Sequence, residues 1–189
     1  MADHAVRARS FGAVAEEYDR GRPGYPSEAV AWALGSEPLD VVDLGAGTGK
    51  LTATLVQTGH RVVAVEPDPE MRALLERDLP SVRVAAADAE ATGLPAASAD
   101  AVVAGAAFHW FDRSRVFPEI ARLLRPPGVL ALFGNSFADD SDWAERFRKL
   151  GHGAAPGRAG RWPEADELST YFQAVEDARF AHTHHVTRA

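Results

Sequence analysis

Three closely spaced glycines follow a short apolar run and could bring bare backbone against a ligand. They are Gly45, Gly47 and Gly49 in VVDLGAGTGKLT, which also holds Asp43. Glycine lets a chain turn sharply and approach a ligand without a Cβ in the way. The dinucleotide fingerprint needs its third glycine where Lys50 stands, and the phosphate-loop pattern is not completed either. The spacing therefore counts against NAD, FAD and nucleoside triphosphates, with a plain strand-to-helix turn as the alternative.

Two acids lie at the ends of the next two apolar runs. Glu66 ends RVVAVE and Asp88 ends VRVAAAD. In open α/β sheets, ligands bind where the carboxyl ends of the strands meet, and an acid after the second strand can bind ribose hydroxyls. The alternatives are a solvated loop carboxylate for Glu66 and a turn-forming aspartate for Asp88. Together with the glycine loop, the two acids favour one ligand site at this edge.

The segments that must position these residues alternate between strand and helix patterns. Short apolar runs rich in Val, Leu or Ala predict strands buried on both faces, over 39–45, 61–67, 82–88, 100–106 and 128–134. Amphipathic spacing predicts helices over 10–20, 26–35, 49–59, 68–79, 113–124, 139–151 and 164–175. Asp68 is the predicted N-cap of the helix at 68–79, with Pro69 in its first turn. This order predicts the α/β class, as a doubly wound, Rossmann-like, mostly parallel sheet with helices on both faces.

Length, charge and composition narrow the class of protein. The chain has 189 residues, which suits a single domain over 1–189. Its net charge of -7 gives it no electrostatic attraction to nucleic acid or an anionic membrane. It holds no cysteine, no signal-peptide core and no apolar run near the roughly 20 residues of a membrane span. We therefore predict a cytoplasmic protein whose partner is a small molecule, with no nucleic acid and no membrane.

Metal chemistry is not expected from the sequence. His182, His184 and His185 form a small cluster near the C-terminus. Their spacing is not a known metal-ligand pattern, and terminal histidines are usually exposed to solvent. We therefore predict no metal site.

The glycine loop and the acids that follow resemble the cofactor site of the class I S-adenosylmethionine-dependent methyltransferases. The resemblance implies S-adenosyl-L-methionine as cofactor and S-adenosyl-L-homocysteine as product. It places the loop from Gly45 to Gly49, with Ala46 and Gly47 inside it, beside the methionine part of the cofactor. Asp43 would then reach the amino group, directly or through water.

The same resemblance assigns the nucleoside end of the cofactor. Glu66 would accept hydrogen bonds from both ribose hydroxyls, with Pro67 beside it in the site. Asp88 would accept a hydrogen bond from the adenine amino group, and the Ala89 amide would lie near a ring nitrogen.

Two further motifs narrow the resemblance. The run AFHWFD, residues 107–112, and YDRGRPGYP, residues 18–26, resemble a small-molecule subgroup that includes trans-aconitate methyltransferase relatives. The Asn/Asp-Pro-Pro-aromatic box typical of nucleobase methylation is absent after the fourth predicted strand. The resemblance implies a helical lid over 1–35 on a cofactor-binding core over 36–135. Its predicted lid or substrate residues are Tyr18, Arg22, Tyr25 and Trp110.

His109 is the candidate catalytic residue, because a histidine can take a proton from a nucleophile near neutral pH. A core histidine bonded to backbone is the alternative. Ala106 and Phe108 are predicted near the adenosine, and Trp110 as pocket wall or core. Arg22 either binds a substrate carboxylate or forms a surface ion pair. A carboxylate acceptor needs no base for an in-line displacement, whereas a hydroxyl or an acidic carbon does.

Three functions remain open from the sequence. The first is methyl transfer to a small molecule that offers a carboxylate, hydroxyl or acidic carbon. The second is a non-catalytic S-adenosylmethionine-binding or regulatory protein with an incomplete acceptor site. The third, an NAD or nucleotide-sugar enzyme, requires the missing third glycine.

The C-terminal part departs from the resembling family. Sheets of that family have seven strands, the seventh antiparallel between the fifth and sixth. A sixth strand is predicted over 178–186, but no return strand follows. We expect either a C-terminally truncated chain or an edge that is completed differently, since an open edge strand invites association. The protein is expected to be a monomer or homodimer.

Overall fold

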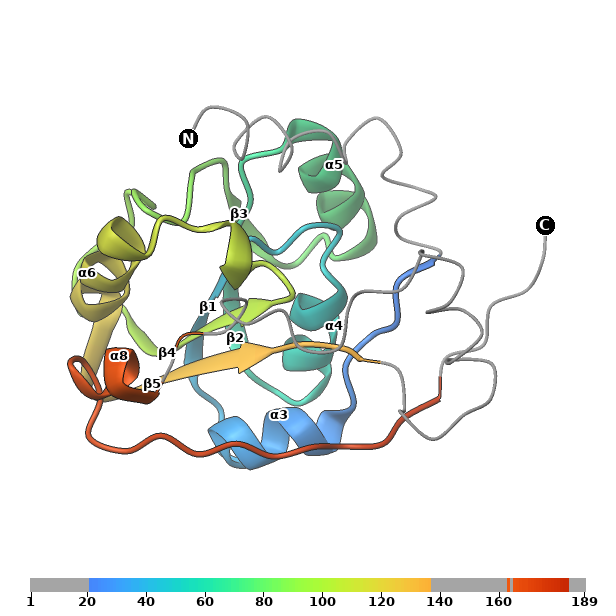
Figure 1. Cartoon of the computed structure of the whole chain (residues 1–189). Coiled ribbons are helices and arrows are strands. Elements are labelled where there is room, and N and C mark those ends of the chain that lie inside the picture. The colour runs from blue at the N-terminus through green and yellow to red at the C-terminus, as the bar shows by residue number, and fades with distance from the viewer. Residues whose placement is uncertain (1–20, 137–162, 164, 184–189) are drawn as a thin grey trace, which may run out of the picture.

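The computed structural model describes residues 21–136, 163 and 165–183 (Figure 1). The predicted helices over 10–20 and 139–151 therefore lie outside the described residues, as does Tyr18. The same holds for most of the predicted lid over 1–35.

The described chain forms a five-stranded sheet in the order β3-β2-β1-β4-β5, and every neighbouring pair is parallel. The strands are β1 (Asp40–Leu44), β2 (Arg61–Val65), β3 (Arg83–Ala85), β4 (Ala99–Gly105) and β5 (Leu124–Phe133). Each falls on one of the five predicted strand segments. The order steps outward from β1 in both directions, which confirms the doubly wound α/β class.

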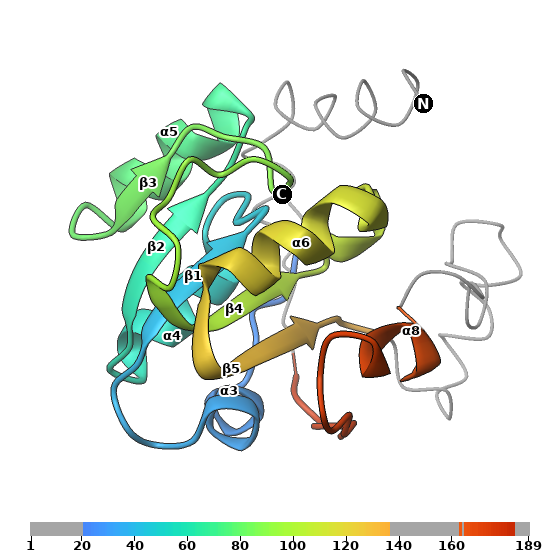
Figure 2. The same ribbon diagram turned by 90° about the vertical axis from the view of Figure 1, so that its left-hand side faces the viewer.

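Helices cover both faces of this sheet. They are α3 (Ser27–Leu34), α4 (Lys50–Gln57), α5 (Pro69–Asp78), α6 (Arg113–Leu123) and the short α8 (Ala165–Ser169). On one face α3 and α4 pack against Val41 and Val103. On the other, α6 packs against the alternate residues Val42 and Val102, and Figure 2 shows α6 in front of the sheet. Each central strand is therefore buried on both sides, as its continuous apolar sequence predicts.

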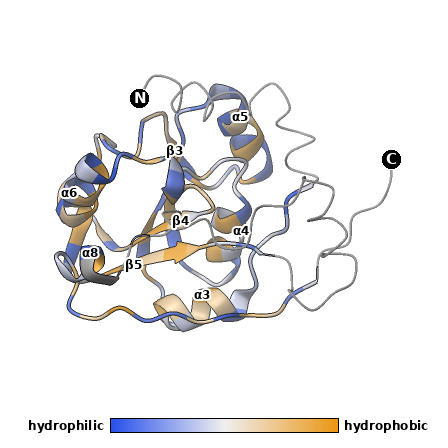
Figure 3. Cartoon of the chain, viewed as in Figure 1, coloured by the Kyte–Doolittle hydropathy of each residue, from blue (hydrophilic) through white to orange (hydrophobic). Residues whose placement is uncertain are grey.

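The helix signals read from the sequence place α5 and α6 correctly. Asp68 caps α5, because its side chain accepts hydrogen bonds from the Glu70 and Met71 amides at 2.9 and 3.0 Å. Four apolar side chains of α6 are buried, namely Val116, Phe117, Ile120 and Leu123. Figure 3 shows hydrophilic and hydrophobic colours side by side on α6, whereas β5 is mostly hydrophobic.

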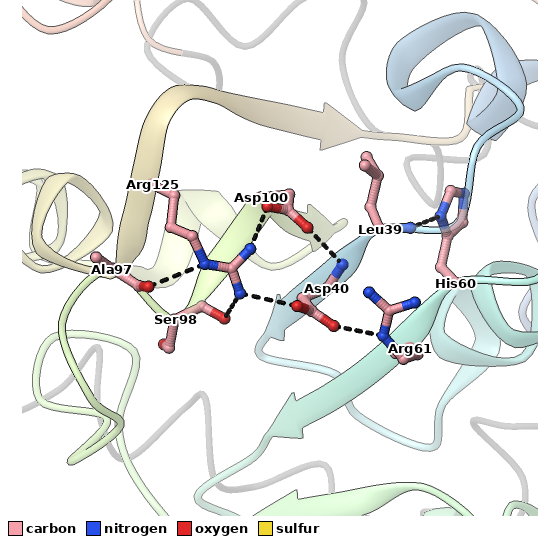
Figure 4. Close-up of polar contacts among 8 residues, drawn as sticks. All are labelled: Leu39, Asp40, His60, Arg61, Ala97, Ser98, Asp100 and Arg125. Atoms are coloured by element: carbon pink, nitrogen blue, oxygen red, sulfur yellow. Dashed lines mark hydrogen bonds and ion pairs between the residues drawn. The ribbon is translucent and has the colours of Figure 1, made fainter.

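A network of charges joins the strands at their amino ends (Figure 4). The guanidinium of Arg125 donates to Asp40 Oδ2 at 2.8 Å and also to Asp100 Oδ1. It donates further to the backbone carbonyls of Ala97 and Ser98, at 3.0 and 2.8 Å. Arg61 donates to the other oxygen of Asp40 at 2.6 Å. One end of the sheet is thus held by charges that are matched in pairs.

Two C-terminal predictions are wrong. The helix predicted over 164–175 is only Ala165–Ser169, because the amides of Thr170 and Tyr171 bond to carbonyls three residues earlier and form turns that end it. Tyr171 then stacks on Phe117, with ring centroids 4.9 Å apart. The strand predicted over 178–186 is not formed in its described part, up to residue 183. Its one large apolar side chain, Phe180, packs against Trp32 of α3 instead of joining the sheet.

In the part of the chain described here, no helix has the length and apolar character needed to cross a membrane.

Candidate active site

A cavity opens at the carboxyl ends of β1, β2, β4 and β5, where the parallel-sheet rule places a ligand. The segment before α3 and the start of α4 complete its walls. Its lining residues are Arg22, Pro23, Tyr25, Asp43, Gly45, Ala46, Gly47, Thr48, Lys50, Leu51, Glu66, Met71, Gly105, Ala106, Ala107, Trp110 and Asn135. Nine of the predicted site residues are among them: Arg22, Tyr25, Asp43, Gly45, Ala46, Gly47, Glu66, Ala106 and Trp110.

The glycine loop lies at the floor of this cavity in a conformation that needs glycine. Gly45 and Gly47 have φ values of +65° and +58°, in the left-handed region that disfavours other residues. A Cβ on Gly45 would lie 2.7 Å from the Cβ of Ala107, so this glycine allows two chain segments to approach closely. A Cβ on Gly47 would meet nothing within 4 Å, so the backbone there faces open space. The loop thus offers bare main chain to a ligand.

Glu66 fixes the loop to the end of β2. Its Oε2 accepts a hydrogen bond from the Gly47 amide at 2.8 Å, and its Oε1 accepts one from the Asp68 amide at 2.9 Å. The side chain is only 7% exposed. Burial raises the pKa of Glu66 from its ordinary value, while the two backbone amides act in the opposite direction. A carboxylate bonded in this way has lone pairs left for hydroxyl groups of a ligand.

Asp43 is the second buried acid of the cavity. It is fully buried, and its Oδ2 accepts a hydrogen bond from Thr52 Oγ1 at 2.7 Å. Its Oδ1 is also buried and has no hydrogen-bond partner in the protein. Burial foremost, with a contribution from the negative charge of Glu66, raises the pKa of Asp43 to about 7. Two neighbouring acids with raised pKa values suit a ligand that brings positive charge.

The segment before α3 closes one side of the cavity. The backbone carbonyl of Tyr25 accepts a hydrogen bond from Thr54 Oγ1 at 3.0 Å, and its ring meets Phe133 edge-on at 5.9 Å. Asn135 Nδ2 donates to the Gly24 carbonyl at 3.2 Å. These contacts fix the segment before α3 beside the cavity, and the lid role of Arg22 and Tyr25 stays a prediction.

Several predicted site residues lie outside this lining. Asp88 is exposed, and its carbonyl accepts a hydrogen bond from the Ala91 amide at 3.1 Å, as in a turn. Phe108 is 2% exposed and packs against Phe111 and Phe117 in the core. The ring of His109 lies 4.9 Å from that of Trp110. Also outside the lining are Gly49, Pro67 and Ala89. The roles assigned to all of these residues stay predictions.

The structure adds residues that the sequence analysis missed. Asn135 follows β5 as Glu66 follows β2, so the strand-end rule would have found it. Thr52 was missed because its contact with Asp43 depends on how α4 lies over β1. The backbone of Ala106 has a φ of +52°, which is uncommon for a residue with a Cβ and typical of functional sites. The other additional residues of the lining are Pro23, Thr48, Lys50, Leu51, Met71, Gly105 and Ala107.

The donor set fits an adenosylated amino acid better than a metal. Within the described ranges, no group of three or more His, Cys, Asp or Glu side chains is placed to hold a metal ion. The orphan oxygen of Asp43 suits an ammonium group, and Glu66 suits vicinal hydroxyls. The open backbone at Gly47 leaves room for the chain that joins these two parts.

Comparison with known proteins identifies the family. Residues 42–132 match the family described as "Methyltransferase domain". An uncharacterized methyltransferase of Mycobacterium tuberculosis is 46% identical over 142 residues, covering 75% of this chain and 57% of that protein. Trans-aconitate 2-methyltransferase of Azoarcus sp. is 36% identical over 172 residues, covering 77% of this chain and 67% of that enzyme. A solved methyltransferase-like structure from Anaeromyxobacter dehalogenans superposes with a TM-score of 0.62 at 34% identity, over 73% of this chain and 62% of that one.

The fold is a doubly wound sheet with a cavity at the carboxyl ends of its strands. The chain belongs to the class I S-adenosylmethionine-dependent methyltransferases, which confirms the resemblance drawn from the glycine loop. Methyl transfer from S-adenosylmethionine is the chemistry of this family. The chain spans 57% of the length of its mycobacterial relative.

Proposed function

We propose that this protein transfers a methyl group from S-adenosyl-L-methionine to the carboxylate of a small molecule. The observation that carries the proposal is the cavity in which Asp43, the glycine loop and Glu66 converge. The bound cofactor supplies a methyl group already activated by its sulfonium. The protein therefore has to bind, orient and exclude water, which can lower a barrier by about 7–11 kcal/mol.

Different residues of the cavity would bind different parts of the cofactor. Asp43 would receive the ammonium group, and the loop from Gly45 to Gly49, with Ala46, would follow the methionine part. Glu66 would receive the ribose hydroxyls. The adenine would extend toward Asp88 and Ala89, and Pro67, Ala106 and Phe108 complete the predicted surroundings.

The acceptor end of the cavity favours a carboxylate. Arg22 lines the cavity and carries a guanidinium suited to binding a carboxylate with two hydrogen bonds. Trp110 also lines the cavity. The similar enzyme of Azoarcus is named for trans-aconitate, a carboxylic acid. These observations support an anionic acceptor held by Arg22 under the segment before α3.

A carboxylate acceptor would need no general base in the cavity. His109 is not among its lining residues, although its ring lies against Trp110, which is. If the acceptor is instead a hydroxyl or an acidic carbon, His109 or Tyr25 would have to take the proton. We place the reaction in the cytoplasm, on a free small molecule, with a monomer or homodimer as the enzyme.

Labelled S-adenosylmethionine offered with a panel of carboxylic acids, phenols and acidic carbon compounds tests this proposal. We expect binding of S-adenosylhomocysteine by calorimetry and label in a methyl ester that mild base hydrolyses. Transfer only to phenols or carbon acids would overturn the carboxylate assignment. Cofactor binding without transfer to any acceptor would favour a non-catalytic binding protein, and absence of binding would overturn the site itself.

Arg22→Met provides the matched variant for the acceptor. It keeps most of the side-chain length but removes the guanidinium. We expect KM for the acid to rise at least tenfold while S-adenosylhomocysteine affinity stays within about twofold. Arg115→Met on the exposed side of α6 is the control and is expected to change neither quantity.

A further inference from the structure

Asp43 is placed where a carboxylate is costly to bury. Alternation along β1 puts Val41 and Asp43 on the same face, the one that α4 covers. Leu51 and Leu55 of α4 are among the buried residues of that layer. An ionised group in such surroundings loses its hydration unless a partner replaces it. A fully buried acid with one unpartnered oxygen therefore needs a functional explanation.

Thr52 supplies the single side-chain partner that Asp43 has on α4. This threonine is also fully buried, and its hydroxyl donates to Oδ2 at 2.7 Å. Because Oδ2 already accepts that hydrogen, a proton on Asp43 resides on Oδ1. A cationic ligand group that binds Asp43 must also use Oδ1, since it is the oxygen left without a partner. The proton and the cationic ligand group therefore compete for Oδ1 of Asp43.

The charges around Asp43 come from three elements. Glu66 approaches from the end of β2, and its negative charge favours a proton on Asp43. Lys50 at the start of α4 and Arg22 before α3 line the same cavity, and each side chain ends in a basic group. The acids of the cavity are Asp43 and Glu66, and burial raises the pKa of both.

We propose that Thr52 is a positioning residue that holds the Asp43 carboxylate so that Oδ1 exchanges its proton for the ammonium group of the cofactor. When the ammonium group binds, the proton leaves Oδ1 for solvent and the ligand's N–H takes its place. No covalent bond to carbon changes. The proposal rests on the proposed cofactor site but not on the identity of the methyl acceptor.

The exchange gives cofactor binding a defined pH dependence. The pKa of Asp43 in the free protein is raised to about 7, so the acid is protonated below that pH and ionised above it. Affinity for S-adenosylhomocysteine is therefore expected to rise about tenfold per pH unit up to pH 7 and then level off. Near pH 6 about one proton should be released per ligand bound.

Calorimetry with two ligands tests the proposal. S-adenosylhomocysteine carries the ammonium group, whereas 5′-methylthioadenosine has the same nucleoside and sulfur without it. We expect the pH slope and the proton release with the first ligand alone, measured in buffers of different ionisation enthalpy. Glu66→Gln removes the titration of the neighbouring acid, and the slope should persist in that variant at a lower overall affinity.

Thr52→Val is the decisive variant, because valine keeps the shape and removes only the hydroxyl. We expect about tenfold or greater loss of S-adenosylhomocysteine affinity, a pH midpoint shifted upward and no change for 5′-methylthioadenosine. Thr52→Ser should restore both affinity and midpoint. Thr58→Val, whose hydroxyl bonds only to carbonyls of its own helix, is the control.

Three outcomes separate this inference from the function on which it rests. Failure of the wild-type protein to bind S-adenosylhomocysteine would overturn the proposed function. Binding with no pH slope would overturn the exchange at Asp43. Equal loss of both ligands in Thr52→Val, without rescue by serine, would show a merely structural role for Thr52.

Discussion

The carboxylates at the two ends of the sheet have different kinds of hydrogen-bond partner. At the amino ends of the strands, Asp40 and Asp100 accept hydrogen bonds from the guanidinium of Arg125 (Figure 4). At the carboxyl ends, Asp43 accepts from a hydroxyl and Glu66 from backbone amides. Paired charges favour the folded state, whereas buried acids without a cationic partner oppose it. The second arrangement is therefore the one expected at a ligand site, which we propose for this end of the sheet.

The pKa values follow this contrast. Hydrogen bonds from Arg61 and then Arg125 lower the pKa of Asp40. The backbone amide of Asp40, followed by Arg125, lowers that of Asp100. Burial raises the pKa values of both Asp43 and Glu66. The pKa values of the acidic side chains are thus shifted in opposite directions at the two ends of the sheet.

The largest expected effect comes from a substitution in the glycine loop, at the carboxyl ends of the strands. Gly45→Val places a Cβ 2.7 Å from that of Ala107 at a φ of +65°, so the loop must move. We expect loss of S-adenosylhomocysteine binding beyond about a hundredfold and destabilisation of about 1–3 kcal/mol. Gly59→Ala is the matched control, with a φ of +90° at a turn where a Cβ would meet nothing within 4 Å. Gly59→Ala should lower the stability of the protein without weakening ligand binding.

Removing Glu66 tests the ribose contact. Glu66→Ala is expected to weaken S-adenosylhomocysteine by about 1–3 kcal/mol, because hydrogen bonds to a charged group are lost. Calorimetry provides the measurement, with Glu76→Ala on the exposed face of α5 as the control. An affinity equal to that of the wild type would remove Glu66 from the site.

A substitution at the amino ends of the strands should lower stability and leave ligand affinity unchanged. Arg125→Met leaves Asp40 and Asp100 without the guanidinium that they share. We expect Tm to fall by a few degrees while S-adenosylhomocysteine affinity stays unchanged. A weakened ligand with an unchanged Tm would contradict the division of roles between the two ends.

Stability against pH should show both ends at once. Asp40 and Asp100 have lowered pKa values, so their contribution is present above their ordinary value of 3.8 and is lost as pH falls below it. Asp43 has a raised pKa, so the native state holds a proton that the unfolded chain has lost. Its contribution therefore declines as pH rises from about 4 to about 7. Denaturant titrations should give maximal stability at mildly acidic pH, and Asp43→Asn should flatten only the upper limb.

The smallest expected effect is a gain in stability at Ala106. Its φ of +52° is costly for a residue with a Cβ and easy for glycine. Ala106→Gly is expected to raise the free energy of unfolding by up to about 1 kcal/mol. A loss of stability measured in urea would show that contacts of the Ala106 methyl group outweigh the strain.

The sequence was sufficient wherever a local pattern decides the structure. The five strands, the cap at Asp68 and the turn at Gly45 each follow from residues within a few positions of one another. The convergence of Asp43 and Glu66 followed from the rule for parallel strand ends. Contacts between distant segments could not be read in this way. The bond from Thr52 to Asp43 and the bonds of Arg125 depend on how a helix or strand lies over its neighbour.

In the C-terminal part, local sequence patterns predicted elements that tertiary packing prevents. Phe180 and Tyr171 looked like members of a strand and a helix, because their neighbours fit those periods. In the structure each ring instead packs on an aromatic partner far away in the chain, Trp32 and Phe117 respectively. Tertiary packing thus outweighed a weak local preference.

A crystal structure of the protein with S-adenosylhomocysteine tests the central claim most directly. We expect the ammonium group within hydrogen-bond reach of Asp43 Oδ1, the ribose hydroxyls on Glu66, and the intervening chain along Gly45 to Gly49. A nucleoside bound elsewhere, or a Glu66 side chain that makes no contact with it, would contradict the account.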